Sequence, residues 1–590
     1  MNPASTQDGT GAAPARKLVT QDDSAHDFLR IRVAGSLDLG TPLKLVQLPA
    51  AEQAGDSTAE QKLTPAYDGW IGRRIEYHLV PSREAPRIAI TDAGLVTGYG
   101  IFGSPGTGKT RLLLHILKDA LNLSSHQPEW KYGGLLLDPK AAMVDEAAQM
   151  WPDLGPDRRG DLIIIQPDLL NDPSRFAKLG LDPAHQYTRL NVLDSALPPL
   201  ELARMLVLAA QSAGVAAKEP FWFLAWTNLF AAALTLLEYF ERRVPTVRDL
   251  VDAILLPDDF QQSRQTFSRV AGDGERYLRR IEVLADRVKM NGGAEAEEIH
   301  RRVPIIPLEQ IEADLAAAAA QIESFFESDY VRTLEAFISN AFGAFQQYRF
   351  RCLSRGSRSL LDKYGSRPKR PSFYDSIIEQ GKVVVVSVGP EDPGMGKTLC
   401  TLVKCLFQQA VMSRRERFLG GKLTNFKRPL FIACDEYSEI ASEVPGQPMG
   451  DGRFFALARE NGCMGLLATQ SVHTLENSSL SEAWKSIFSN MAAKIFMGAA
   501  DNETAKQASE LAGTLDWEMA STSVSQAKEH SFSRQASFQQ RPELTPYILT
   551  HVLKQRQAVA IGSLDGRSTA PALRFFQVPT AKPKAKNNAK

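Results

Sequence analysis

The residues with the clearest chemistry form the run Gly103-Ser-Pro-Gly-Thr-Gly-Lys-Thr110, which fits the pattern G-x-x-x-x-G-K-[ST] at every fixed position. Glycines let backbone N–H groups turn inward around phosphates, and the N-terminus of a following helix adds positive potential. The apolar pair Ile101-Phe102 precedes the run, and a helical pattern begins at Arg111. This order predicts a strand, a phosphate-binding loop and a helix, and therefore a site for ATP.

Two side chains of this loop have predicted roles in binding Mg²⁺ and ATP. Lys109 is expected to reach the β- and γ-phosphates, and the hydroxyl of Thr110 is expected to bind Mg²⁺. The candidate nucleotide contacts are Gly103, Ser104, Pro105, Gly106, Thr107, Gly108, Lys109, Thr110 and Arg111.

Two acids after an apolar strand provide the remaining hydrolytic chemistry. The run Pro429-Leu-Phe-Ile-Ala-Cys ends in Asp435-Glu436. In a phosphate-loop enzyme the first acid completes the Mg²⁺ shell and the second polarises the attacking water. A second apolar run ends in Gln470, whose amide can touch both the γ-phosphate and that water. We predict Asp435 as a metal ligand, Glu436 as the base and Gln470 as a sensor of nucleotide state.

A second run, Asp392-Pro-Gly-Met-Gly-Lys-Thr398, is similar to a phosphate loop but departs from the pattern. Its first required glycine falls at position 391, which is Glu391. A carboxylate beside phosphates is repulsive. We therefore interpret this run as a helix N-terminus with no nucleotide of its own.

Composition and cysteine spacing give no indication of a nucleic-acid-binding charge, a cysteine metal site or a secreted protein. The chain has 590 residues, too many for one core, and 44% hydrophobic residues, an ordinary value for a globular protein. Lys+Arg and Asp+Glu are both 68, so overall charge gives no indication of nucleic acid. The five cysteines lack paired metal spacing and are expected to be reduced core residues. We find no signal peptide and interpret the apolar run 221–239 as a buried helix.

The pattern along the chain alternates between strands and helices and is interrupted once. Apolar runs predict strands at 133–138, 161–166, 382–388, 430–434, 465–468, 493–497 and 557–561, with a helix at 141–150. Between them, helices are predicted at 200–210, 221–240, 247–255, 274–289 and 311–345. The predicted organisation is a disordered N-terminus (1–25), a small β-rich segment (26–97), the first part of the ATPase core (98–197), an inserted all-α domain (198–357), the second part of the core (358–578) and a basic disordered tail (579–590).

Five motifs in this order resemble the TraG/TraD-type coupling ATPases of conjugation and type IV secretion, in the FtsK/HerA superfamily. They are Gly103–Thr110, Leu137-Asp-Pro-Lys140, Phe431–Glu436, the run from Arg459 to Gln470, and Asn490–Met497 with Asp501-Asn-Glu-Thr-Ala505. The resemblance covers roughly residues 80–575. It implies an α/β, RecA-like phosphate-loop fold with a mostly parallel sheet. It also implies a ring of six copies, in which Arg459 is an arginine finger acting on a neighbour's ATP.

The resemblance further implies DNA, including single-stranded DNA, and relaxosome or secretion-channel proteins as partners. Two departures from the family stand out. Typical members begin with transmembrane helices, which we do not find here, so we expect a cytoplasmic protein or one recruited to the inner membrane by a partner. The family often continues Asp-Pro-Lys with Gly-Glu, whereas Ala141-Ala142 follow here.

A basic segment is the candidate for direct DNA contact. Between residues 349 and 370 Asp362 is the sole acid, and aromatic residues alternate with the basic ones, as suits phosphate contact. The basic residues are Arg349, Arg351, Arg355, Arg358, Lys363, Arg367, Lys369 and Arg370. The alternative interpretation is a solvated basic linker between the helical insertion and the sheet.

Three functions remain open from the sequence. The first is ATP-driven movement of DNA or a DNA–protein substrate in conjugation or secretion. The second is a soluble HerA-like translocase in DNA processing or defence. The third is a nucleotide-switched adaptor that recruits a substrate through the helical domain and hardly turns over. Glu436 argues against the third, because a pure switch needs no acid to activate water.

Overall fold

The structure is a computed structural model. It describes residues 36–49, 75–82, 87–123, 128–141, 143–154, 156–158, 160–170, 172–178, 190–214, 220–256, 278–328, 330–354, 356–365, 369–388, 392–443, 450–480, 482–498, 501–526, 530–566 and 572–579. The segments predicted to be disordered, 1–25 and nearly all of 579–590, lie outside these ranges, as does the whole of 50–74.

One twelve-stranded sheet runs through the molecule in the order β2-β1-β14-β13-β10-β4-β9-β8-β5-β7-β6, with β3 paired to β1. Its strands are β1 (Ser36–Pro49), β2 (Ile75–Pro81), β3 (Ile88–Thr91), β4 (Gly98–Gly103), β5 (Gly133–Asp138), β6 (Leu162–Ile165), β7 (Val383–Ser387), β8 (Leu430–Cys434), β9 (Cys463–Thr469), β10 (Met491–Met497), β13 (Gln557–Gly562) and β14 (Ala572–Gln577).

The half of the sheet from β10 to β6 is parallel throughout, whereas β13, β14, β1 and β2 continue it in antiparallel pairing. β9 lies between β4, which leads to the phosphate-binding loop, and β8, which leads to the two acids. This arrangement confirms the predicted fold class, a RecA-like phosphate-loop α/β fold with a mostly parallel sheet. The carboxyl ends of parallel strands meet at one edge, where such folds bind their ligands.

Helices cover both faces of the parallel half because its strands are apolar on both sides. Leu136, Ile164 and Phe431 pack on one face with α1 (Lys109–Asn122) and α2 (Val144–Met150). Leu137, Ile163 and Ile432 pack on the other face with α14 (Pro393–Leu419) and the helices beyond it. The remaining helices of this part are α3 (Pro167–Leu170), α4 (Pro173–Lys178), α13 (Phe373–Gln380), α15 (Asp451–Leu457), α16 (Val472–Glu476), α17 (Ala483–Asn490) and α18 (Asn502–Ala512).

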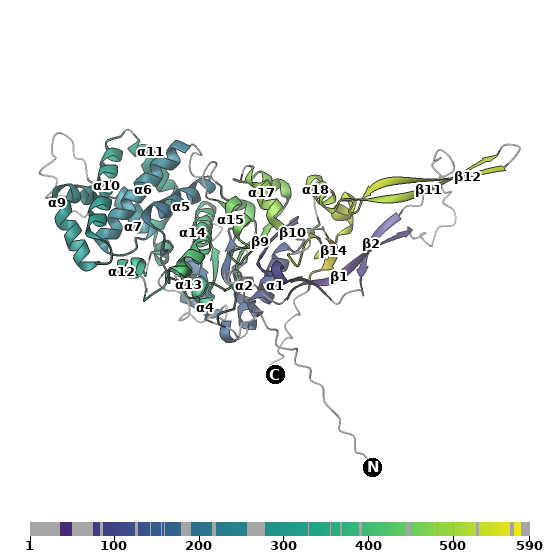
Figure 1. Ribbon diagram of the computed structural model, residues 1–590, viewed down its shortest axis with the longest axis horizontal. Coiled ribbons are helices and arrows are strands. Elements are labelled where there is room, and N and C mark those ends of the chain that lie inside the picture. Colours follow the sequence, from purple (N-terminus) through teal and green to yellow (C-terminus); the bar gives the residue numbers. More distant parts are fainter. Residues whose placement is uncertain are drawn as a thin grey trace, which may run out of the picture.

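A group of helices occupies one end of the elongated molecule (Figure 1). Its members are α5 (Pro199–Ser212), α6 (Pro220–Glu241), α7 (Val247–Leu255), α9 (Arg280–Arg302), α10 (Leu308–Phe326), α11 (Val331–Phe342) and α12 (Leu360–Tyr364). Within the described residues between β6 and β7, no named strand interrupts them. α5 packs on α14, which joins the group to the sheet. One helix, Pro220–Glu241, is long and apolar enough to cross a membrane, but it packs between α5 and α10 as a core helix.

Several predicted elements have different bounds in the structure. The helix predicted at 141–150 begins at Val144, because Ala141 has a left-handed backbone (φ 55°) that a helix cannot contain. The predicted helix 311–345 is two helices, α10 and α11. The helix predicted at 274–289 runs from Arg280 to Arg302 and bends at Asn291, directly before Gly292-Gly293; residues 274–277 lie outside the described part of the chain.

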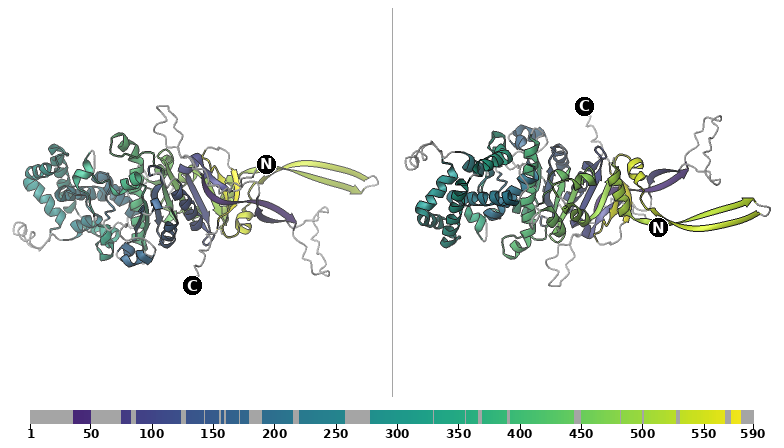
Figure 2. Two further views of the ribbon diagram at one scale, coloured as in Figure 1. Left: turned by 90° about the horizontal axis from the view of Figure 1, so that it is seen from below. Right: turned by 90° about the horizontal axis from the view of Figure 1, so that it is seen from above.

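The opposite end of the molecule carries two ribbons (Figures 1 and 2). β11 (Thr514–Gln526) and β12 (His530–Pro542) form a separate two-stranded antiparallel sheet, which the sequence patterns did not predict. β1 and β2 form the second ribbon, but β1 also pairs with β14. The N-terminal β-rich segment is therefore part of the central sheet, since β14 exposes an edge that β1 completes.

Candidate nucleotide-binding site

The run Gly103–Thr110 forms a tight loop between β4 and α1. Gly106 and Gly108 have left-handed backbones with φ 80° and 107°, which glycine adopts without steric cost. The N–H of Ser104 donates to the carbonyl of Gly498, at the end of the neighbouring strand β10. The loop is thus held against β10 in the strand–loop–helix setting that the motif requires.

Lys109 is only 6% exposed, although it is a cation. Its Nζ donates to the carbonyls of Gly103 at 2.7 Å and Ser104 at 3.3 Å, so the ammonium lies inside the curve of the loop. Burial lowers the pKa of Lys109, and the nearby carboxylates of Glu436 and Asp435 oppose that shift. The lysine is therefore placed where a polyphosphate would meet it.

Thr110 and Asp435 are 325 residues apart in sequence, and the fold brings them into contact. The hydroxyl of Thr110 donates to Oδ2 of Asp435 at 2.6 Å. Oδ1 of Asp435 is buried and has no hydrogen-bond partner among the described residues. Leaving a buried carboxylate oxygen unpaired is costly unless a cation or a water molecule binds it. Burial is the main cause of the raised pKa of Asp435. A hydroxyl beside an unsatisfied carboxylate oxygen fits Mg²⁺, which takes few protein ligands besides phosphates and water.

Glu436 lies beside Asp435 in a strained left-handed backbone conformation (φ 58°, ψ 51°), which non-glycine residues adopt at a cost of order 1–3 kcal/mol. Its Oε1 accepts a hydrogen bond from Nε2 of Gln470 at 3.1 Å. Nζ of Lys140 lies 3.4 Å from the same oxygen. The ends of β8, β9 and β5 thus converge on one carboxylate.

Lys140 is the residue of this group to which the sequence assigned no role. It belongs to the run Leu137-Asp-Pro-Lys, directly after β5. The left-handed Ala141 turns the chain there, and Oδ2 of the buried Asp138 accepts from the N–H of Met143 at 2.7 Å. The sequence pattern that could have revealed Lys140 is an acid and a base that follow a buried parallel strand. They lie at the edge of the sheet where the other candidate site residues lie.

Arg459 does not lie in this group. It follows α15 and lines a cavity of about 460 Å³ with Thr97, Gly98 and Lys494, at the amino ends of β4 and β10. The phosphate-binding loop begins at the other end of β4, which has six residues and so is about 20 Å long. Arg459 is exposed. It cannot serve the loop of its own chain. Arg111 is also exposed and, within the described part of the chain, forms no hydrogen bond or ion pair with Asp435 or Glu436.

The second glycine-containing run differs from the first in its surroundings. The side chain of Asp392 accepts from the N–H of Met395 and caps the start of α14. Lys397 forms an ion pair with Glu439. A capped helix with its lysine paired agrees with our interpretation of a helix N-terminus; Glu391, on which that interpretation depended, lies outside the described residues.

Four basic residues of the segment 349–370 are engaged in internal contacts, so they are less available to DNA than a solvated basic segment would be. Arg358 pairs with Asp194 at 2.5 Å, with both side chains 2% exposed. Lys363 pairs with Glu238 at 2.8 Å and is equally buried. Arg349 pairs with Asp168. Arg351 stacks on the ring of Tyr348. Arg355 and Arg367 lie outside the described residues, so Lys369 and Arg370 are what remains of the candidate surface.

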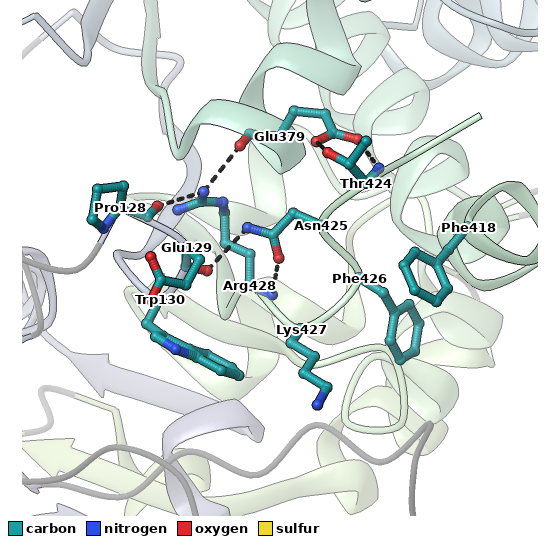
Figure 3. A pocket seen from close by; sticks show the side chains of 10 residues that line it. All are labelled: Pro128, Glu129, Trp130, Glu379, Phe418, Thr424, Asn425, Phe426, Lys427 and Arg428. Atoms are coloured by element: carbon teal, nitrogen blue, oxygen red, sulfur yellow. Dashed lines mark hydrogen bonds between the residues drawn. The ribbon is translucent and has the colours of Figure 1, made fainter. Parts of the chain in front are cut away.

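A cavity of about 470 Å³ lies at the amino ends of β5 and β8, away from the phosphate-binding loop (Figure 3). Its aromatic lining includes Trp130, Phe418 and Phe426. Arg428 also lines it, and its guanidinium donates to the backbone carbonyls of Pro128 and Glu379, which belong to the same lining. Burial lowers the pKa of Arg428 to about 10. These contacts are structural, and the cavity is separate from the nucleotide site.

Comparison with known proteins locates the resemblance in the second half of the chain. Residues 429–552 match the family described as the TraM recognition site of TraD and TraG. This range contains Asp435, Glu436, Arg459 and Gln470. The resemblance to TraG/TraD-type proteins is therefore confirmed for these residues. No curated protein shows a significant match to the chain.

Solved structures of low identity are also similar. The bacterial conjugative coupling protein TrwB with sulphate is 13% identical, with 83% of this chain and 87% of that chain covered and a TM-score of 0.47. Plasmid coupling protein TrwB with ADP and Mg²⁺ is 12% identical, with 84% and 88% covered and a TM-score of 0.46. VirB4 of Thermoanaerobacter pseudethanolicus is 10% identical, with 82% and 89% covered and a TM-score of 0.36. Values this low transfer no residue role to this chain.

Proposed function

We propose that this chain is a coupling ATPase of the TraG/TraD type, which hydrolyses ATP to move DNA or a DNA–protein substrate in conjugation or type IV secretion. The observation that carries the ATPase part is the convergence of Lys109, Thr110, Asp435 and Glu436 at the carboxyl edge of one parallel sheet. The match of residues 429–552 supports the choice of family.

Each residue of the group has a role that its contacts support. The loop N–H groups and Lys109 bind the phosphates, and Thr110 with Asp435 holds Mg²⁺, which neutralises phosphate charge when bound. Glu436 accepts a proton from the attacking water. Gln470 and Lys140 hold the carboxylate of Glu436 through contacts at 3.1 and 3.4 Å. Because both partners are polar groups aimed at the same oxygen, a γ-phosphate that attracts either one would change the position of Glu436.

The ring, its partners and its substrate belong to the same proposal. Arg459 lies too far from its own loop to act in cis, which supports action on a neighbouring copy in a hexameric ring. DNA is the proposed substrate, and relaxosome or channel proteins are the proposed partners, in keeping with the family description of residues 429–552. The structure does not favour the segment 349–370 as the DNA contact, since Arg358 and Lys363 are buried in ion pairs.

The proposal is tested by measuring ATP turnover with no nucleic acid, with single-stranded DNA and with double-stranded DNA, and by measuring particle mass under the same conditions. We expect turnover to rise severalfold with one form of DNA and the mass to correspond to six chains. A protein that binds ATP but shows no turnover under any condition would instead support the adaptor hypothesis. Turnover unaffected by DNA would reject translocation of DNA.

Replacing Glu436 by Gln is expected to leave ATP binding intact and to slow hydrolysis by about 10²- to 10⁴-fold. The amide keeps the shape and the contact with Gln470 but cannot accept a proton. Single-turnover phosphate release and nucleotide affinity, measured on the same sample, separate the two effects. Glu439→Gln, which alters a carboxylate paired with Lys397 on the next turn, is the control and should hydrolyse normally. Normal turnover by the Glu436 variant would mean that another group is the base.

A further inference from the structure

A turn near the C-terminal end of the chain contacts the phosphate-binding loop directly. The N–H of Arg556 donates to the carbonyl of Thr107 at 2.8 Å. The side-chain Nε2 of Gln555 donates to the carbonyl of Gly106 at 3.1 Å. Two consecutive residues, about 450 positions away in sequence, therefore hold two consecutive carbonyls of the loop.

The side chain of Arg556 lies on the same loop. A Cβ atom built on Gly108 would come within 3.1 Å of Cγ of Arg556. Gly108 is the residue before Lys109 and forms the N-terminal cap of α1. The stem of the arginine therefore packs beside the part of the loop whose N–H groups cradle the α- and β-phosphates in proteins with this motif.

The backbone at Arg556 is strained, and the surroundings keep it so. Its φ of 65° is left-handed, which is uncommon for a non-glycine residue. Its carbonyl accepts from the N–H of Val578 at 2.9 Å and from Nε2 of Gln577 at 3.2 Å. The turn is closed by a bond from the N–H of Gln557 to the carbonyl of Lys554. Strain retained by several specific bonds is characteristic of functional sites.

The guanidinium of Arg556 is available to a ligand. Arg556 is partly exposed, and its side chain forms no hydrogen bond or ion pair with any other residue in the part of the chain that the structure describes. Other cations nearby are engaged: Lys109 bonds to loop carbonyls and Lys140 pairs with Glu436. An unpaired arginine held beside a phosphate-binding loop is suited to charge-assisted bonds with phosphate oxygens.

We propose that Arg556 is a further nucleotide-binding residue, which the strained turn Lys554–Gln557 places beside Gly108 to bind the α- and β-phosphates of the same chain's nucleotide. The inference rests on the proposed ATP site and adds to it a contact from the turn that precedes β13. It differs from the role of Arg459, which would act on a neighbour and in the transition state. Because ADP retains both phosphates, Arg556 should contribute equally to ADP and ATP affinity.

The test is a titration of the full chain with ADP and with a non-hydrolysable ATP analogue, each with Mg²⁺, by calorimetry. Arg556→Met keeps an unbranched stem beside Gly108 and removes the guanidinium. We expect it to weaken both nucleotides equally, on the order of ten- to one-hundred-fold. Arg556→Lys should lose less, because it keeps the charge but not the planar fork. Lys554→Met, which removes an exposed cation of the same turn, is the matched control and should bind both nucleotides normally.

The other outcomes each contradict the inference. Wild-type affinity in Arg556→Met would show that the residue only packs on the loop, and loss confined to the ATP analogue would place its contact at the γ-phosphate. If Arg556→Met is unstable in thermal melting, Arg556→Gly, which relieves the left-handed backbone, gives the same comparison. Lys109→Ala in the same titration separates the two proposals: if it also binds normally, the ATP site itself is wrong.

Discussion

Replacing Lys109 by Ala is expected to reduce ATP turnover below detection, a loss on the order of 10³-fold or more, because the charge that meets the β- and γ-phosphates disappears. The fold should remain intact. Nζ of Lys109 bonds to carbonyls of the loop itself, and the apolar packing of α1 comes from residues such as Leu112 and Leu113. Phosphate release and thermal melting, measured together, check both parts of this expectation.

Lys118→Ala is the matched control for this experiment. Lys118 is on the same helix, and its ion pair with Asp153 is 3.0 Å long and largely exposed. Exposed pairs contribute about 0–1 kcal/mol, so both turnover and melting should stay near wild type. Wild-type turnover in Lys109→Ala would show that Gly103–Thr110 is not the catalytic loop. A large fall in melting temperature would instead mean that Lys109 has a structural role.

The central sheet could be predicted because its parallel strands are short apolar runs, and β4, β5, β8 and β9 lead directly to candidate site residues. β8 was predicted with its observed bounds, and β7, β9 and β10 to within two residues. Burial on both faces makes such strands conspicuous in a sequence. The antiparallel strands other than β13 were harder to predict. β11 and β12 are rich in Ser and Gln and alternate weakly, and the position of β1 depends on β14, more than 500 residues away.

The candidate site was predictable where a side chain's role follows from its own motif. Thr110 and Asp435 belong to two such motifs, and the fold places the hydroxyl of Thr110 2.6 Å from Oδ2 of Asp435. Arg556 has no such signal, and the motif that contains Lys140 did not reveal a role for it, because the positions of both depend on left-handed backbones, at Ala141 and at Arg556 itself. The internal contacts of the basic segment could not be predicted for a different reason. Counting charges cannot reveal that the partners of Arg358 and Lys363 lie more than a hundred residues earlier and are buried with them.

If Arg459 is an arginine finger, replacing it by Ala is expected to leave ATP binding normal and to reduce hydrolysis by on the order of 10³-fold or more. Arg459 lies at the amino end of β4, beside Gly98, whereas the loop begins at Gly103. A chain cannot bring this arginine to its own nucleotide without breaking the sheet. Arg453→Ala, six residues earlier and also exposed, is the control and should retain activity.

Mixing two inactive variants shows whether Arg459 acts on a neighbour. Arg459→Ala chains have an intact loop, and Lys109→Ala chains have an intact arginine. Where a Lys109→Ala chain presents Arg459 to the loop of an Arg459→Ala chain, one complete site forms, which neither variant can form alone. Activity should therefore appear in the mixture, peak at an intermediate ratio and vanish on dilution below the concentration of assembly. A mixture that assembles and exchanges subunits, as mass measurements would show, but gains no activity would place Arg459 outside the reaction.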